Sequence, residues 1–131
     1  MNIVLGYDGS DSARRALERA AELANGGTIT CVAAVRLLGA KGGLAYSPIE
    51  LEDYAAALRE AKERLQELRI DARIVQGRGD PAGVIAAEAL EEHADLVVVG
   101  SEHKNVLERL LFGSVSEGVL HRAKTDVLVV A

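Results

Sequence analysis

Apolar residues follow two different spacings along this chain. Short, almost wholly apolar runs are typical of buried strands, and they occur at 2–8, 28–35, 95–100 and 126–131. Residues 71–76 alternate polar and apolar positions, which predicts a half-exposed strand at the edge of a sheet. Elsewhere apolar residues recur every three or four positions, and this predicts helices over 11–24, 47–68, 80–93 and 114–122.

Capping residues support these helix boundaries. Residues 25–27 (NGG) are typical of a helix C-terminus, and 47–50 (SPIE) match the order of cap, first-turn proline and capping-box glutamate. Two segments are predicted to be loops. Residues 36–47 contain three glycines and predict a mobile loop, and 101–112, bounded by glycines, are predicted to form another loop.

The expected order of elements is β-α-β-α-β-α-β-α-β within one domain spanning residues 1–131. Helical crossovers between buried strands give an α/β fold, a parallel sheet with helices on both faces. Ligands of such sheets bind beyond the carboxyl ends of the strands, where the strand order reverses. The strand ends available here are Asp8, Val35, the turn at 77–80 and Gly100.

Composition narrows the classes of partner. Apolar residues make up 49% of the chain, aromatic residues only 3%, and the net charge is −5. Few aromatic rings and a negative charge disfavour nucleic acid and anionic membranes as partners. No segment reaches the roughly 18 consecutive apolar residues of a membrane span, so a cytoplasmic protein is expected. Cys31 stands alone in an apolar run, which predicts a small buried side chain.

The segment from Gly100 to Ser116, GSEHKNVLERLLFGSVS, carries the main candidate chemistry. Gly100 ends an apolar strand, and Gly113-Ser114 begins a predicted helix. Bare backbone N–H groups and the positive end of a helix dipole attract an anion at such a place, and phosphate is the natural candidate. In the alternative interpretation, the glycines only permit tight turns.

Two further features of this segment affect its affinity for an anion. Residues 114–117 (SVSE) fit a capping box, which is compatible with anion binding because a cap uses only one of the free N–H groups. Lys104 and Arg109 are offset by Glu102 and Glu108. The attraction must therefore come from backbone N–H groups, and we expect it to be modest.

A catalytic apparatus is not recognisable in the sequence. His93 and His121 lie near predicted helix ends and have no acidic residue or cysteine at metal-ligand spacing, so no metal site is expected. The P-loop signature and the G-x-S-x-G nucleophile elbow are both absent. A phosphoryl-transfer enzyme is also disfavoured, because its metal ligands and arginine clamp are missing.

Four segments are distinctive: IVLGYDGS with the SARRAL that follows, GRGDPAGVI, ADLVVVGS, and LLFGSVSEGVLHRAKTDVLVV. Through them the chain resembles the universal stress protein family over essentially its whole length. The resemblance implies an open five-stranded parallel sheet of order 3-2-1-4-5, similar to that of adenine nucleotide alpha hydrolases, with helices on both faces. The strand order would then reverse between the first and fourth strands.

Many members of this family bind ATP or a related nucleotide through a G-x-x-G-x9-G-[S/T] pattern, and others lack the pattern and bind none. Gly100 and Gly113-Ser114 match the pattern, but His103 replaces its second glycine. The imidazole either obstructs the path of the phosphates or donates a hydrogen bond to one of them, with Lys104 adding positive charge. A dimeric interaction module that has lost nucleotide binding is therefore the alternative.

The resemblance implies a nucleotide site made of the following residues: Gly6, Asp8, Ala34, Val99, Gly100, His103, Gly113, Ser114, Val115 and Ser116. Main-chain atoms of Gly6 and Ala34 would lie beside adenine. Asp8 either contacts the ribose, the base or a metal-bound water, or caps the helix over 11–24 together with Ser10. The implied ligand is ATP or a related adenine nucleotide, for which Mg2+ is a candidate companion.

The last strand, 127–130, is an apolar edge under the family's strand order. Pairing with a second copy about a two-fold axis would cover this edge, as the resemblance also implies, and covering by the chain's own loops is the alternative. We therefore expect a cytoplasmic homodimer that acts as a nucleotide-responsive stress or regulatory protein, with protein partners that the sequence does not identify. Slow ATP hydrolysis is compatible with this role, although no residue resembles a water-activating base.

Overall fold

A computed structural model describes residues 1–35, 48–102 and 104–131 of the chain. The described strands are β1 (Asn2–Gly6), β2 (Thr28–Val35), β3 (Asp71–Arg78), β4 (Leu96–Gly100) and β5 (Asp126–Val130). The described helices are α1 (Asp11–Ala24), α2 (Pro48–Glu67), α3 (Pro81–Glu91), α4 (Lys104–Phe112) and α5 (Ser114–Ala123). The predicted loop at 36–47, with the cap at Ser47, lies outside the described residues, as does His103.

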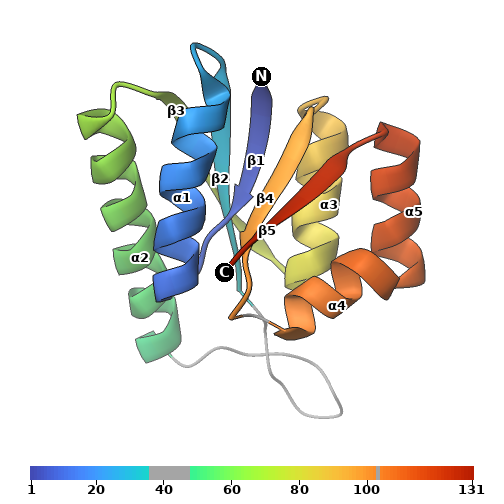
Figure 1. Cartoon of the computed structure of the whole chain (residues 1–131). Coiled ribbons are helices and arrows are strands. Elements are labelled where there is room, and N and C mark those ends of the chain that lie inside the picture. The colour runs from blue at the N-terminus through green and yellow to red at the C-terminus, as the bar shows by residue number, and fades with distance from the viewer. Residues whose placement is uncertain (36–47, 103) are drawn as a thin grey trace.

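The strands form one parallel sheet of order β3-β2-β1-β4-β5, which confirms the fold class that the family resemblance implied (Figure 1). β1 pairs with β2 on one side and with β4 on the other, so Leu5 lies opposite both Cys31 and Val98. The order of the strands therefore reverses between β1 and β4. Their carboxyl ends lie side by side at the edge of the sheet where ligands of such folds bind.

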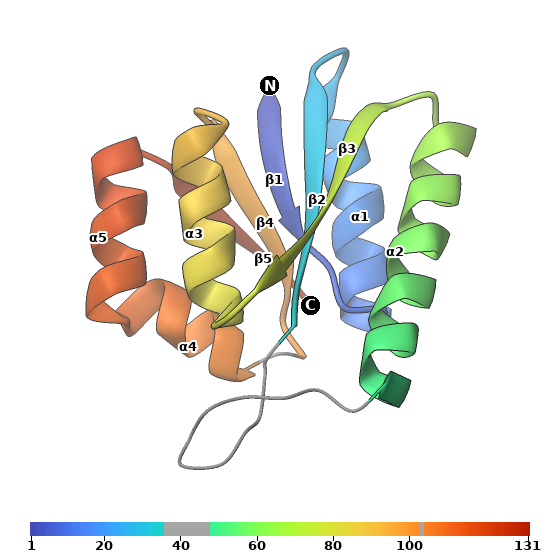
Figure 2. The same cartoon turned by 180° about the vertical axis from the view of Figure 1, so that it is seen from behind.

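Helices cover both faces of the sheet, as Figures 1 and 2 show from opposite sides. Ile3 and Leu5 of β1 point into the core that α1 and α2 cover, whereas Val4 points into the core beneath α3, α4 and α5. All three side chains are completely buried. Burial on both faces explains why the inner strands are continuous apolar runs, whereas β3 at the edge alternates in exposure.

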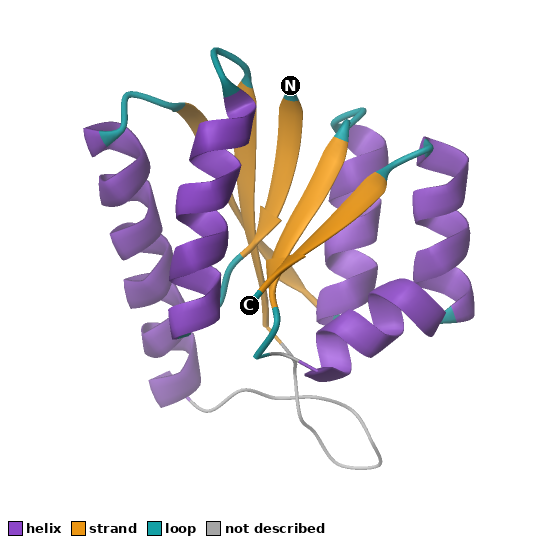
Figure 3. Ribbon diagram, viewed as in Figure 1, coloured by secondary structure: helices purple, strands orange, loops and turns teal. Residues whose placement is uncertain are grey.

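Helix α4 shows that the predicted loop over 101–112 is wrong. Val106, Leu107 and Leu110 recur at helical spacing and pack into the core beneath α3 and α5, with Leu110 only 1% exposed. Packing of this apolar face stabilises a helix that its short sequence would not form alone. The helix lies next to the carboxyl ends of the strands and leads directly into α5 (Figure 3).

The helix N-termini differ in how they are capped. α1 and α3 begin at side-chain caps, Ser10 and Asp80, as is typical of their residue types. α5 begins instead with Gly113 at the N-cap and no side-chain cap hydrogen bond. The capping box predicted at 114–117 is therefore wrong, because Ser114 is already the first helical residue. The first turn of α5 keeps backbone N–H groups that no capping side chain takes.

Cys31 is completely buried in the core beneath α1 and α2, which confirms the prediction of a small buried side chain. Burial raises the pKa of its thiol to about 12. The helices in the described part of the chain include none that is both long and apolar enough to cross a bilayer.

Candidate functional site

A cavity of about 70 Å³ opens at the carboxyl ends of β1 and β4, where the strand order reverses. The residues that line it come from the sheet, from the turn after β1 and from four helices: Gly6, Tyr7, Asp8, Ala13, Val32, Tyr54, Pro81, Ile85, Val99, Gly100 and Val106. A largely apolar wall with a few polar groups is typical of small-molecule sites. Of the predicted site residues, the structure brings Gly6, Asp8, Val99 and Gly100 together here.

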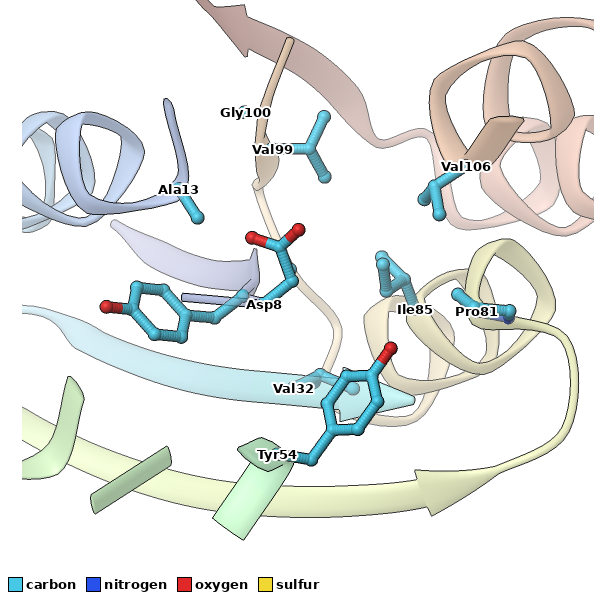
Figure 4. A pocket seen from close by; sticks show the side chains of 11 residues that line it. Asp8, Ala13, Val32, Tyr54, Pro81, Ile85, Val99, Gly100 and Val106 are labelled. Carbon is cyan, nitrogen blue, oxygen red and sulfur yellow. The ribbon is translucent and has the colours of Figure 1, made fainter. Parts of the chain in front are cut away.

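Asp8 lies in the turn between β1 and α1. One of its carboxylate oxygens accepts a hydrogen bond from the backbone N–H of Ser10 at 2.9 Å. The predicted direct cap by Asp8 is thereby corrected, since Ser10 is the N-cap of α1 and Asp8 holds Ser10 in place. The carboxylate of Asp8 also points into the cavity, toward Val99 (Figure 4). Asp8 therefore stabilises the turn and presents negative charge where a ligand would lie.

Gly6 and Gly100 each have a packing reason to be glycine. A Cβ atom on Gly6 would lie 2.8 Å from Cδ1 of Ile85, so the missing side chain lets α3 approach β1. A Cβ atom on Gly100 would lie 2.4 Å from Oγ of Ser12 and 2.7 Å from the backbone nitrogen of Ala13. Gly100 thus allows the first turn of α1 to approach the end of β4. The close packing of these elements gives the cavity its walls.

Residues 113–116 lie at the far end of α4 and do not line the cavity. Gly113 joins α4 to α5 tightly, and a Cβ atom there would lie 2.3 Å from the carbonyl oxygen of Arg109. Val115 is 74% exposed, so its side chain faces solvent, whereas Ser116 is buried. The uncapped start of α5 retains the features of an anion site, but α4 stands between this site and the predicted strand end.

Two predicted site residues, Ala34 and His103, are not fully described. The backbone of Ala34 pairs with Gly77 at the end of β2, beside the same edge of the sheet. His103 lies outside the described residues. Its two proposed effects on a bound phosphate, obstruction and hydrogen bonding, stay predictions.

Tyr54 is the main site residue that the sequence did not reveal. It belongs to the apolar stripe of α2, yet its hydroxyl points into the cavity from the side opposite Val99 (Figure 4). Ile85 and Pro81 of α3 and Val106 of α4 also line the cavity. The available signal for this site residue was a tyrosine on an otherwise aliphatic stripe. It lies near the helix end that meets the carboxyl edge of the sheet.

Charged groups on residues near the cavity walls already have partners. The guanidinium of Arg109 lies 3.1 Å from the carboxylate of Asp80 at the start of α3. The carboxylate of Glu102 accepts a hydrogen bond from the backbone N–H of Ser12, and this bond holds the pKa of Glu102 below its usual range. Within the described residues, no group of three or more His, Cys, Asp or Glu side chains is arranged to hold a metal ion.

Comparisons with known proteins agree with the fold and with the resemblance. The model of the universal stress protein family matches residues 1–131. Universal stress protein Rv1636 of Mycobacterium tuberculosis is 35% identical over 98% of this chain and 94% of its own length. A universal stress protein of Thermus aquaticus is 32% identical over 98% of this chain and 96% of its own length.

Solved structures give the same result. The crystal structure of a universal stress protein in complex with cAMP is 30% identical, has a TM-score of 0.69, and covers 100% of this chain and 97% of its own. The structure of a universal stress protein from Archaeoglobus fulgidus in complex with dAMP, which is 24% identical, has a TM-score of 0.73 and covers 100% of this chain and 98% of its own. The chain belongs to the universal stress protein family.

Proposed function

We propose that this protein binds an adenine nucleotide in the cavity at the ends of β1 and β4. The observation that carries the proposal is the position of that cavity, at the reversal of strand order, with the carboxylate of Asp8 pointing into it. A structural relative that is 30% identical over the whole chain was solved with cAMP, which supports an adenine nucleotide as the ligand class.

The walls of the cavity suit the parts of a nucleotide. Val32 and Ile85 offer an apolar surface to a flat base, and the main chain of Gly6 pairs with Val32 and packs against Ile85. The carboxylate of Asp8 can accept hydrogen bonds from ribose hydroxyls, and the hydroxyl of Tyr54 offers a second polar contact. The cavity of about 70 Å³ holds only a few water-sized groups, so the phosphate of a nucleotide extends out of it.

In this proposal the protein is a cytoplasmic homodimer that responds to nucleotide and regulates other proteins, rather than a metabolic enzyme. The dimer forms through residues 127–130 of β5, whose outer edge no described strand covers. ATP, with or without Mg2+, belongs to the same ligand class as the monophosphates.

Isothermal titration calorimetry tests the proposal directly. AMP should release measurable heat, and GMP, which differs only in its base, should bind more weakly. Tyr54→Phe removes one hydroxyl from the cavity and should weaken AMP binding about 3- to 10-fold, the effect of one lost hydrogen bond. Tyr7 also lines the cavity, but its hydroxyl reaches Glu60 at 3.5 Å in the groove between α1 and α2, so Tyr7→Phe removes a hydroxyl that is engaged outside the cavity and serves as the comparison. Absence of heat with every adenine nucleotide at millimolar concentration would contradict the proposal.

A second candidate function, a dimeric interaction module without nucleotide, is favoured by one observation. Phe112 is 79% exposed and Val115 is 74% exposed, and both lie at the junction of α4 and α5. Exposed apolar side chains at one place are typical of protein contacts. His103→Gly separates the two functions, because it restores the second motif glycine. It should strengthen nucleotide binding if the ring obstructs the phosphates, weaken it if the imidazole is a ligand, and leave a pure interaction module unchanged.

A further inference from the structure

Glu102 and Ser12 exchange two hydrogen bonds across the gap between β4 and α1. The backbone N–H of Ser12 donates to Oε2 of Glu102 at 3.0 Å, and the backbone N–H of Glu102 donates to Oγ of Ser12 at 3.1 Å. Ser12 is completely buried. The backbone and one carboxylate oxygen of Glu102 are therefore each tied to Ser12, and the exposed carboxylate is restrained by one hydrogen bond.

The negative charge of Glu102 takes the place of an external anion at the start of α1. Three backbone N–H groups of the first turn have partners, because Ala13 donates to Oγ of Ser10, Arg14 donates to the carbonyl oxygen of Ser10, and Ser12 donates to Glu102. A carboxylate at a helix N-terminus is stabilised by the helix dipole. The hydrogen bond from Ser12 lowers the pKa of Glu102, so the carboxylate is ionised at neutral pH. The start of α1 is not available to the phosphate of a ligand.

This carboxylate lies beside the cavity. Gly100, two residues before Glu102, lines the cavity, and so does Ala13, the neighbour of Ser12. Asp8 adds a second negative charge inside the cavity.

The described cations near this rim are already engaged. Arg109 is paired with Asp80 at the start of α3. Arg15, which contributes a smaller share of the lowered pKa of Glu102, donates from Nε to the carbonyl oxygen of Ala131 at 2.6 Å. Among the described side chains, the rim of the cavity therefore carries fixed negative charge that these two cations only partly offset.

We propose that Glu102 is a specificity-determining residue that makes the site favour adenine nucleotides of low phosphate charge, a monophosphate or a cyclic monophosphate, over ATP. This inference rests on the proposed function. A fixed carboxylate repels every additional phosphate charge that a ligand brings to the rim, and the repulsion grows with the number of charges. This repulsion does not affect contacts with the base and the ribose. The site therefore distinguishes between adenine nucleotides by their phosphate charge alone.

Calorimetric titration of the full chain with adenosine, AMP and ATP, without Mg2+, tests this. The variant Glu102→Gln keeps the length of the side chain and an oxygen that can accept from Ser12, but it removes the charge. The wild type should bind AMP more tightly than ATP. Glu102→Gln should raise the affinity for ATP relative to AMP about 3- to 10-fold and leave adenosine unchanged. Glu91→Gln, which removes the same charge from an exposed residue at the far end of α3, should leave the ratio unchanged.

Salt provides a second readout that needs no variant. Raising NaCl should reduce the preference of the wild type for AMP, because added ions screen the repulsion at the rim. If Glu102→Gln melts at a lower temperature than the wild type, the salt titration of the wild type still tests whether repulsion at the rim produces the preference for AMP.

The outcomes separate the inference from the proposed function. An ATP-to-AMP ratio that is the same in the wild type and in Glu102→Gln, or that does not change with salt, would overturn the role of Glu102 while nucleotide binding stands. A wild type that binds ATP more tightly than AMP would do the same. If neither adenosine nor any nucleotide binds to any of the variants, both the inference and the proposed function fail.

Discussion

Gly100 is the last residue of β4, and Gly118 lies in the middle of α5. The two glycines differ in how closely other atoms pack against them. A Cβ atom on Gly100 would meet the backbone of α1 at 2.7 Å, whereas a Cβ atom on Gly118 would meet no atom within 4 Å. At Gly100 the missing side chain is required by packing. At Gly118, in the middle of α5, packing within this chain gives no reason for glycine.

The two glycines should respond to alanine in opposite directions. Gly118→Ala should stabilise the protein by about 0.5–1 kcal/mol, because alanine loses less backbone entropy in a helix. Gly100→Ala should destabilise it by about 1–3 kcal/mol, because α1 must move away from β4. Urea denaturation of both variants measures these changes. A loss of stability in Gly118→Ala would show that α5 needs the glycine for a reason other than its packing.

Because the thiol of Cys31 is buried, the free energy of unfolding should depend on pH in the alkaline range. Burial raises the pKa of the native thiol to about 12, whereas an unfolded thiol ionises near pH 8.5–9. The native state then binds more protons than the unfolded state between those values, so the free energy of unfolding falls as pH rises. The slope should approach about 1.4 kcal/mol per pH unit above about pH 9. It should be much smaller in Cys31→Ala, in which the raised pKa of Tyr7 adds a slope that begins only near pH 10. Urea denaturation of the two proteins from pH 7 to 10 measures it, and parallel curves would refute the prediction.

At the scale of elements, α4 decides the shape of the site. It contributes Val106 to the cavity wall, places Arg109 against Asp80, and separates the start of α5 from the end of β4. Its apolar face is buried against the core, and its other face carries the exposed Phe112. The helix therefore depends on tertiary contacts rather than on its own propensity.

Two adjacent leucines of α4 test its orientation. Leu110 is 1% exposed and Leu111 is 37% exposed, so only the first has its side chain enclosed. Leu110→Ala should cost about 2–4 kcal/mol of unfolding free energy, because it leaves a cavity in the core. Leu111→Ala should cost less than about 1 kcal/mol. Thermal or chemical denaturation of the pair provides the comparison, and equal losses would mean that the segment does not pack as this helix.

At the scale of the whole molecule, no described strand pairs with the outer edge of β5. The strand lies at one edge of the sheet and pairs with β4 in register from Asp126 to Val130. The carbonyl oxygen of Val130 accepts from Ser101, so it points toward β4. Because successive residues of a strand point their N–H and C=O groups to opposite sides, those of Val129 point outward, away from β4.

Val129→Pro tests dimerisation through this edge. Proline removes an N–H group that faces outward, so pairing with a second copy loses a hydrogen bond while the pairing with β4 keeps its own. We expect the wild type to sediment as a dimer and the variant to shift toward monomer at micromolar concentration. Circular dichroism should show that the variant remains folded. A wild type that is monomeric in analytical ultracentrifugation would contradict the proposed dimer.

The sequence by itself determined the layered α/β architecture, the positions of most elements, and a site at the carboxyl edge of the sheet. These features follow from local apolar periodicity, from strand ends and from family motifs. Each of these signals depends on residues that are close together in the sequence. The prediction of a loop over 101–112 was wrong because it depended on the glycines that bound the segment, whereas the burial of Leu110 stabilises a helix. The cap at 114–117 was wrong because Gly113 is the N-cap and Ser114 is already helical.

Only the tertiary structure decided which side chains share the site. Tyr54 comes from α2, which is distant in the chain from both β1 and β4, and Glu102 meets Ser12 across 90 residues. Gly113 and Ser114 belong to the same motif as Gly100, yet α4 keeps them out of the cavity wall. Contacts between segments far apart in the chain depend on how the elements pack, and no local pattern encodes that packing.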